Sequence, residues 1–218
     1  MNGQTLRKFL TAYLFLALAV SGFAKHHKTS NTPGSFDYYM LTLSWAPQFC
    51  ATHPDNKSSS ECDPKRHLGL VVHGLWPQND NGSYPQSCTP AQPVSSDIVR
   101  EMLPYIPTKQ LIQHEWEKHG TCSGLSTQDY FGEIKKLYTG LKVPDKYQQP
   151  SANSQASPGD IEQAFADANS APRSAFRVSC SRQQFVALEV CFDKNFQYRD
   201  CGSLKECPAD QVKILRTP

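Results

Sequence analysis

The chain has 218 residues, of which 22 are lysine or arginine, 20 are acidic and 39% are hydrophobic, and its formal net charge is +2. This length suits one or two domains with a buried core, and the composition excludes a disordered or fibrous protein. The balanced charge does not indicate a general polyanion-binding surface, so any phosphate recognition must come from a local cluster.

The N-terminus predicts a secretory signal peptide. Arg7 and Lys8 precede an apolar run at residues 9–20, and Gly22 and Ala24 supply the small residues of a cleavage site after Ala24. An uncleaved membrane anchor is the alternative, but the apolar run is short for a membrane span.

We expect residues 1–24 to be removed and residues 25–218 to form a single mature domain. That domain keeps 20 basic and 20 acidic residues, so it is neutral overall while its seven histidines are uncharged. It becomes cationic as the pH falls below about 6.5, because histidine titrates there.

All eight cysteines follow the predicted signal peptide. An even number in an exported chain predicts four disulfides, although spacing alone does not choose among roughly a hundred possible pairings. The chain has no CxxC pair of the kind that zinc knuckles use, so metal ligation is weakly supported. The cysteines are Cys50, Cys62, Cys88, Cys122, Cys180, Cys191, Cys201 and Cys207.

The first part of the mature chain predicts two strands separated by a loop. Alternating residues at 38–45 have the period of a strand, and the polar, proline-containing segment 51–67 predicts a loop. The short apolar run 68–72 predicts a buried strand that presents His73 at its end. Residues 77–93 hold four prolines and predict a long loop, a usual position for a functional site.

Three helices are expected next. The first covers 95–103 and is capped by a serine at its start, the second covers 111–119 and is ended by Gly120, and the third covers 127–141 with a threonine cap. In the third helix, apolar residues recur with helical spacing and predict a buried face.

The last part of the chain predicts one helix and one strand. Residues 144–159 are rich in Gln, Ser and Pro and predict an exposed excursion. Asp160 and Gln163 resemble a capping box for a helix over 160–169, and the apolar run 185–192 predicts a strand. Helices and strands follow no regular βα repeat, which favours an α+β fold over a doubly wound sheet.

Two segments carry residues suited to chemistry. The first, VVHGLWP at 71–77, places one histidine beside a glycine and a tryptophan, and a lone histidine there is more often structural. The second, HEWEKHGTC at 114–122, crowds polar groups on one side of a helix, because residues three and four apart are neighbours. Taken alone, this helix face is as typical of an ordinary solvent-exposed surface as of a functional site. Its polar residues are His114, Glu115, Lys118 and His119.

Together, three histidines, one glutamate and one lysine are typical of a phosphoryl-transfer site. One histidine can remove a proton while another supplies one. A lysine and a further protonated histidine can neutralise the charge that grows on a phosphate in the transition state.

HGLWP and HEWEKHGTC, in this order, resemble the two active-site segments of the ribonuclease T2 family of secreted acid endoribonucleases. The similarity covers most of residues 36–207. It implies a single α+β domain, stabilised by disulfides, in which helices flank a central antiparallel sheet, and it implies neither a metal nor a cofactor.

The resemblance also implies roles, residue by residue. His119 resembles the general base and His73 the general acid, while His114 resembles the residue that holds the phosphate. Glu115 and Lys118 resemble the pair that stabilises the pentacovalent intermediate.

Three further positions match the primary base site of the family. Trp76 and Tyr84 stand where aromatic residues line that site. Gln78 stands where a familiar fungal pattern has Asp, a departure that bears on purine preference and not on catalysis. The family further implies pairings of Cys88 with Cys122, Cys180 with Cys207 and Cys191 with Cys201, which leaves Cys50 with Cys62.

The implied function is an exported endoribonuclease with low base specificity that acts on single-stranded RNA. The ribose 2′-OH attacks the phosphorus to give a 2′,3′-cyclic phosphate and then a 3′-phosphate, a route closed to DNA, which lacks that hydroxyl. RNA is the expected partner of a monomer that binds neither DNA nor, after signal cleavage, a membrane. We expect it to be secreted, or periplasmic in a bacterium.

Two other classes of protein compete with this interpretation. A zinc peptidase could use His114, Glu115 and His119, but the spacing departs from HExxH and leaves His73 and Lys118 unexplained. A non-catalytic secreted binding protein or toxin on the same fold is the second alternative, and a test on bulk RNA separates it from the enzyme.

Overall fold

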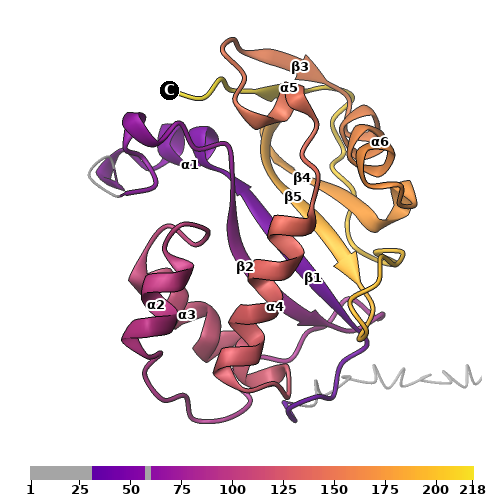
Figure 1. Ribbon diagram of the computed structural model, residues 1–218. Coiled ribbons are helices and arrows are strands. Elements are labelled where there is room, and N and C mark those ends of the chain that lie inside the picture. The colour runs from indigo at the N-terminus through magenta and orange to yellow at the C-terminus, as the bar shows by residue number, and fades with distance from the viewer. Residues whose placement is uncertain (1–30, 57–59) are drawn as a thin grey trace, which may run out of the picture.

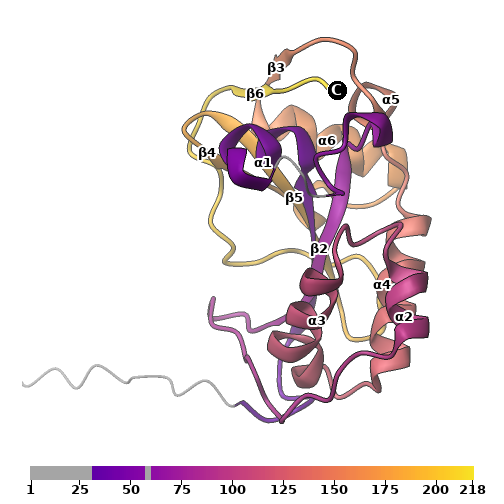
Figure 2. The same ribbon diagram turned by 90° about the vertical axis from the view of Figure 1, so that its left-hand side faces the viewer.

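The computed structural model describes residues 31–56 and 60–218, so the predicted signal peptide lies outside the described residues. One twisted sheet passes through the molecule, with α2, α3 and α4 together on one side and α6 towards the other end (Figures 1 and 2). The chain is an α+β domain, as predicted. No helix among the described residues is long and apolar enough to cross a membrane.

The strands form a single sheet of order β2-β1-β5-β6-β3, in which β4 also pairs with β5. The pairings are antiparallel apart from one parallel bridge between β5 and β6. Strand β2 therefore lies at an edge of the sheet, open to the helix that packs beside it. The strands are β1 (Tyr38–Trp45), β2 (Leu70–Gln78), β3 (Ser154–Ala156), β4 (Phe176–Ser181), β5 (Gln184–Phe192) and β6 (Val212–Ile214).

Serine and threonine side chains begin the four longer helices that follow β2. Ser95, Thr108, Ser126 and Ser157 each accept a hydrogen bond from a backbone N–H of the first turn, which satisfies a donor that the helix leaves free. The helices are α1 (Ala46–Thr52), α2 (Ser96–Met102), α3 (Lys109–Lys118), α4 (Thr127–Gly140), α5 (Asp145–Gln148) and α6 (Pro158–Asn169). Short 3-10 turns are η1 (Pro54–Asn56), η2 (Pro64–Arg66), η3 (Gly120–Cys122) and η4 (Arg173–Ala175).

Both faces of β1 are buried. Tyr39, Leu41 and Leu43 alternate into the main core under the helices, where α4 contributes Tyr130 and Phe131. The residues between them face the other way, where Tyr38 and Met40 pack with the Cys191–Cys201 disulfide in a smaller cluster.

Several predicted boundaries were wrong. The strand expected to end at residue 72 continues to Gln78, so His73 lies inside β2 and not at its end. The helix expected to begin at Asp160 begins at Pro158 and is capped by Ser157, so the capping box was wrong. The expected loop and excursion contain short elements, η1 and η2 in one and α5 and β3 in the other, and the end of α1 reaches into the expected loop. Strands β4 and β6 were not predicted at all.

Four disulfides link the eight cysteines, and the pairs are those that the family resemblance implies. Cys88–Cys122 ties the loop after β2 to the end of α3, and Cys50–Cys62 closes the segment after α1. The other pairs are Cys180–Cys207 and Cys191–Cys201.

Candidate active site

A β-bulge in strand β2 positions His73. Thr42 of β1 is opposite Gly74 and Leu43 is opposite Val72, so His73 is the extra residue without a cross-strand partner. Bulges of this kind redirect a side chain and are frequent beside active sites. The freed imidazole lies with Nδ1 3.2 Å from the hydroxyl of Ser44.

Glu115 of α3 is buried beneath this bulge, with 1% of its surface exposed. Its Oε2 accepts a hydrogen bond of 2.7 Å from Nε1 of Trp76, and its Oε1 lies 3.5 Å from Nε2 of His73. Gly74 makes this approach possible, because a Cβ there would collide with the Glu115 carboxylate and lie 2.6 Å from the Trp76 nitrogen. The carboxylate therefore joins the helix to the edge strand at the site.

His119 is the residue that follows the last turn of α3, and only 2% of it is exposed. Its ring stacks on Trp76 with 5.0 Å between centroids, and the ring of Tyr84 lies 6.1 Å away. Its Nδ1 is buried and has no hydrogen-bond partner among the described residues. No described residue therefore fixes the tautomer of this ring through Nδ1.

The two remaining candidate residues of the segment border the site from the helix. His114 is exposed and Lys118 is half-buried. Their charges act on the buried groups, because Lys118 and His114 both disfavour a second positive charge on His73 and on His119.

Burial governs the titration of the central groups. Desolvation, with the positive charges of His114 and Lys118, lowers the pKa of His73 to about 4. The same causes lower the pKa of His119 to about 3. Burial raises the pKa of Glu115 to about 7, although the Trp76 hydrogen bond and Lys118 oppose it.

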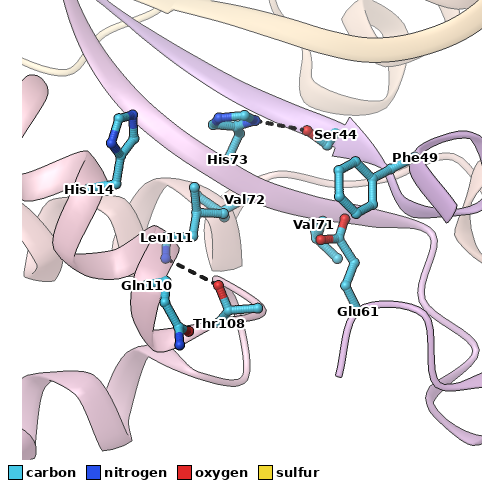
Figure 3. Close-up of a pocket in the computed structure, with 10 residues that line it drawn as sticks. All are labelled: Ser44, Phe49, Glu61, Val71, Val72, His73, Thr108, Gln110, Leu111 and His114. Atoms are coloured by element: carbon cyan, nitrogen blue, oxygen red, sulfur yellow. Dashed lines mark hydrogen bonds between the residues drawn. The ribbon is translucent and has the colours of Figure 1, made fainter. Parts of the chain in front are cut away.

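A cavity of about 390 Å³ opens on the side of His73 away from Trp76. Figure 3 shows His73 and His114 on one side of it and Phe49 with Glu61 on the other. Apolar residues form much of its wall. The lining residues are Ser44, Phe49, Glu61, Val71, Val72, His73, Thr108, Gln110, Leu111 and His114.

The structure brings most of the predicted residues together, although not on one helix face. Glu115 and His119 point into the domain, whereas His114 is exposed beside the cavity. Gln78 lies two residues beyond Trp76 on β2, and only 4% of it is exposed. Tyr84 is 40% exposed, at the outer edge of the His119 ring.

Sequence reasoning missed Ser44, Phe49 and Glu61. Ser44 belongs to the predicted strand, but only the register of β1 against β2 places it beside His73. Phe49 directly precedes Cys50, and Glu61 directly precedes Cys62. The disulfide between these two cysteines brings the two residues close together, and the sequence offers no other indication of their proximity. Within residues 31–56 and 60–218, no group of three or more His, Cys, Asp or Glu is arranged to hold a metal ion.

The fold and the site define a disulfide-linked α+β domain in which a histidine-rich cleft lies between an edge strand and a helix. The sequence model described as the Ribonuclease T2 family matches residues 36–201. The chain belongs to this family.

Curated relatives agree with this assignment. Over 217 residues the chain is 31% identical to Ribonuclease DdI of Dictyostelium discoideum, with 90% of this chain and 93% of the relative aligned. It is 34% identical to a Haemophilus influenzae protein named "Probable ribonuclease" over 81% of this chain. The chain spans 65% of that relative's length, just under two thirds.

A solved structure has the same fold. Trichomaglin, described as a novel S-like ribonuclease, superposes with a TM-score of 0.66 at 26% identity. The superposition covers 84% of this chain and 99% of trichomaglin.

Proposed function

We propose that the protein is an exported endoribonuclease that cleaves single-stranded RNA without a metal ion. The observation that carries this proposal is the pair of imidazoles around one indole. The rings of His73 and His119 lie 5.4 and 5.0 Å from the Trp76 ring, and Glu115 hydrogen-bonds the same indole. Two proton-transfer groups thus lie beside the same tryptophan ring.

In the first step, His119 takes the proton of the ribose 2′-OH and the oxygen attacks the adjacent phosphorus. His73 gives its proton to the departing 5′ oxygen, which leaves a 2′,3′-cyclic phosphate. The low pKa of His119, about 3, supports its role as the neutral base, whereas His73, with a pKa of about 4, gains its proton through the negative charge of the bound phosphate.

In the second, slower step the two roles reverse. His73 removes a proton from water, which attacks the cyclic phosphate, and His119 returns a proton to the 2′ oxygen. The product is a 3′-phosphate, and both histidines regain their starting protonation states.

The remaining residues hold and stabilise the phosphate. The exposed His114 holds a phosphate oxygen, while Glu115 and Lys118 stabilise the pentacovalent intermediate. A base leaves its stack to lie against Trp76 and Tyr84, which favours single strands and gives low base specificity. The buried Gln78 contributes from beneath this base site.

The proposal also covers the export and the cellular location of the protein. Residues 1–24 act as the signal peptide and residues 25–218 as the catalytic domain, which works as a secreted monomer, or in the periplasm of a bacterium. RNA is the partner, whereas DNA and membranes are not. A non-catalytic binding protein is not favoured, since all five residues of the proposed catalytic set are present.

The test is incubation of the oxidised mature domain with RNA and with DNA of the same sequence in excess EDTA. We expect RNA fragments with 2′,3′-cyclic ends and intact DNA. Loss of cleavage in EDTA, or equal cleavage of DNA, contradicts the proposal. RNA that is bound but left intact indicates the non-catalytic alternative.

A further inference from the structure

The cavity beside His73 contains one carboxylate that the proposed reaction does not use. Glu61 lines this cavity with Phe49, Val71 and Leu111, and Figure 3 shows its carboxylate turned towards Phe49 and Val71. An acidic group at a site for a polyanion is unfavourable unless it makes a specific contact. The proposed reaction therefore does not explain why an acidic residue lies at this cavity.

The backbone around Glu61 is fixed on both sides. Cys62, the residue directly after Glu61, forms a disulfide with Cys50. Directly before it, the Ser60 hydroxyl donates to the carbonyl of Pro107, and Arg66 donates to the carbonyl of Ser60 at 3.0 Å. These contacts hold Glu61 against the loop that leads into α3, so its carboxylate is preorganised at the cavity.

The hydrogen-bonding capacity of this carboxylate is not used by the residues that the structure describes. No described residue donates a hydrogen bond to it. A flat, partly apolar ligand would pack on Phe49 and Leu111 and bring its polar edge to the carboxylate. A cavity of about 390 Å³ with apolar walls and one polar group is typical of a small-ligand site.

We propose that Glu61 reads the base of the nucleoside that leaves with the 5′ oxygen, and that its ionised carboxylate selects guanine. This inference rests on the proposed function, because the cavity is lined by His73, the group assigned to protonate that oxygen. Trp76 and Tyr84 do not line the cavity, so the base that stacks on them is a different one.

Guanine is the base whose edge matches an ionised carboxylate. Its N1–H and N2–H donors lie side by side, and a carboxylate offers two acceptors at matching positions. Uracil presents one donor between two carbonyl oxygens, which repel the anion. A protonated carboxyl group has one donor and one acceptor, so it pairs with uracil, cytosine or adenine and loses the selection.

The surroundings of Glu61 make this selection depend on pH. Burial raises the pKa of Glu61 to about 7, and the charges of His53 and Arg66 oppose that rise. His73 and His114 face it across the cavity. The adjoining cavity, which Glu61 also lines, adds the opposite charges of Asp63 and Arg216.

The test compares cleavage of the dinucleotides CpG and CpU from about pH 5 to about pH 8, on either side of the Glu61 titration. Protonation of the catalytic histidines affects the cleavage of both dinucleotides equally, so its effect cancels in the ratio of their kcat/KM values. We expect the ratio CpG/CpU to rise about tenfold with pH in the wild type. It stays flat in Glu61→Gln, which cannot ionise.

Asp55→Asn is the matched control. Asp55 is an exposed acid in the same segment between Cys50 and Cys62 and does not line the cavity. It should behave as the wild type does, which separates hydrogen bonding by Glu61 from a general change of charge. A wild-type ratio that does not vary with pH, or a Glu61→Gln ratio that still rises, overturns the proposal.

A second measurement needs no turnover. Calorimetric binding of dCpG and dCpU, in which the first sugar lacks the attacking hydroxyl, should show the same pH-dependent preference for guanine. Failure of the wild type to cleave any RNA counts against the proposed function alone. Equal affinity for the two ligands at high pH counts against the role of Glu61.

Discussion

His73 and His119 contact the same indole from two sides, but their environments differ. The side chain of His73 is 40% exposed, sits on a bulge at an edge strand and lies within hydrogen-bond distance of Ser44. His119 is 2% exposed, stacks on Trp76 with Tyr84 at its outer edge, and has an Nδ1 without a partner among the described residues. Desolvation lowers the pKa of both rings, to about 4 for His73 and about 3 for His119, and the positive charges of Lys118 and His114 lower both further.

Replacing either histidine by alanine is expected to have the largest effect on activity. Each change removes one proton-transfer group, so kcat should fall by about 10²–10⁴-fold while affinity for RNA changes little. Steady-state kinetics and equilibrium binding of a non-cleavable RNA analogue measure the two quantities. Near-normal turnover in His73→Ala or His119→Ala contradicts the assigned roles. His114→Ala should weaken phosphate binding and therefore raise KM as well as lower kcat.

Gly74→Ala tests the buried carboxylate between the two histidines. The added methyl group would displace Glu115 and break its bond to Trp76, so unfolding free energy should fall by about 1–3 kcal/mol and kcat should fall with it. Urea denaturation and kinetics measure both. Gly132→Ala in α4 is the control, since a Cβ there meets no atom within 4 Å and should stabilise the helix by up to about 1 kcal/mol. Equal stability in the two variants contradicts the packing argument.

The pH dependence of the wild type sharpens the comparison further. Activity is lost below the pKa of the base, about 3, where His119 becomes protonated, and above the pKa of the acid, about 4, where His73 loses its proton. We therefore expect a bell-shaped kcat/KM with its maximum well on the acid side of neutrality, whose limbs belong to the coupled pair. Bound phosphate raises both imidazole pKa values, so kcat should peak at a higher pH. Measurement at constant ionic strength separates this from the growing attraction between RNA and a cationic protein. A rate that still climbs above about pH 8 contradicts this proton inventory.

Ser44→Ala should have the smallest effect. It removes a neutral hydrogen bond to Nδ1 of His73, worth about 1 kcal/mol, so kcat/KM should fall less than tenfold. The alkaline limb of the pH profile should shift more than the acid limb, because Ser44 contacts His73 and not His119. An equal shift of both limbs, or a loss as large as that of His73→Ala, would show that Ser44 does more than orient the ring.

Much of the fold could be predicted because its signals are local. Helices α2, α3, α4 and α6 were predicted from apolar spacing and capping residues within a single segment, although caps and boundaries moved by one to three positions, as with Ser126, Ser157 and Pro158. Strands β4 and β6 escaped prediction because short strands have little periodicity of their own. Pairing with β5 and β3 makes them strands, and that pairing is absent from their sequence.

The sequence by itself determined the chemical inventory of this protein: the two motif segments, the helix that carries Glu115 and His119, and an even number of cysteines in a chain with a predicted signal peptide. Only the tertiary structure decided how that inventory is arranged. The bulge that redirects His73, the contact with Ser44 and the placing of Glu61 across the cavity all depend on strand register and on a disulfide. The physical reason is that a residue type and its helical neighbours are local properties. Burial, and with it each pKa, is set by segments far away along the chain.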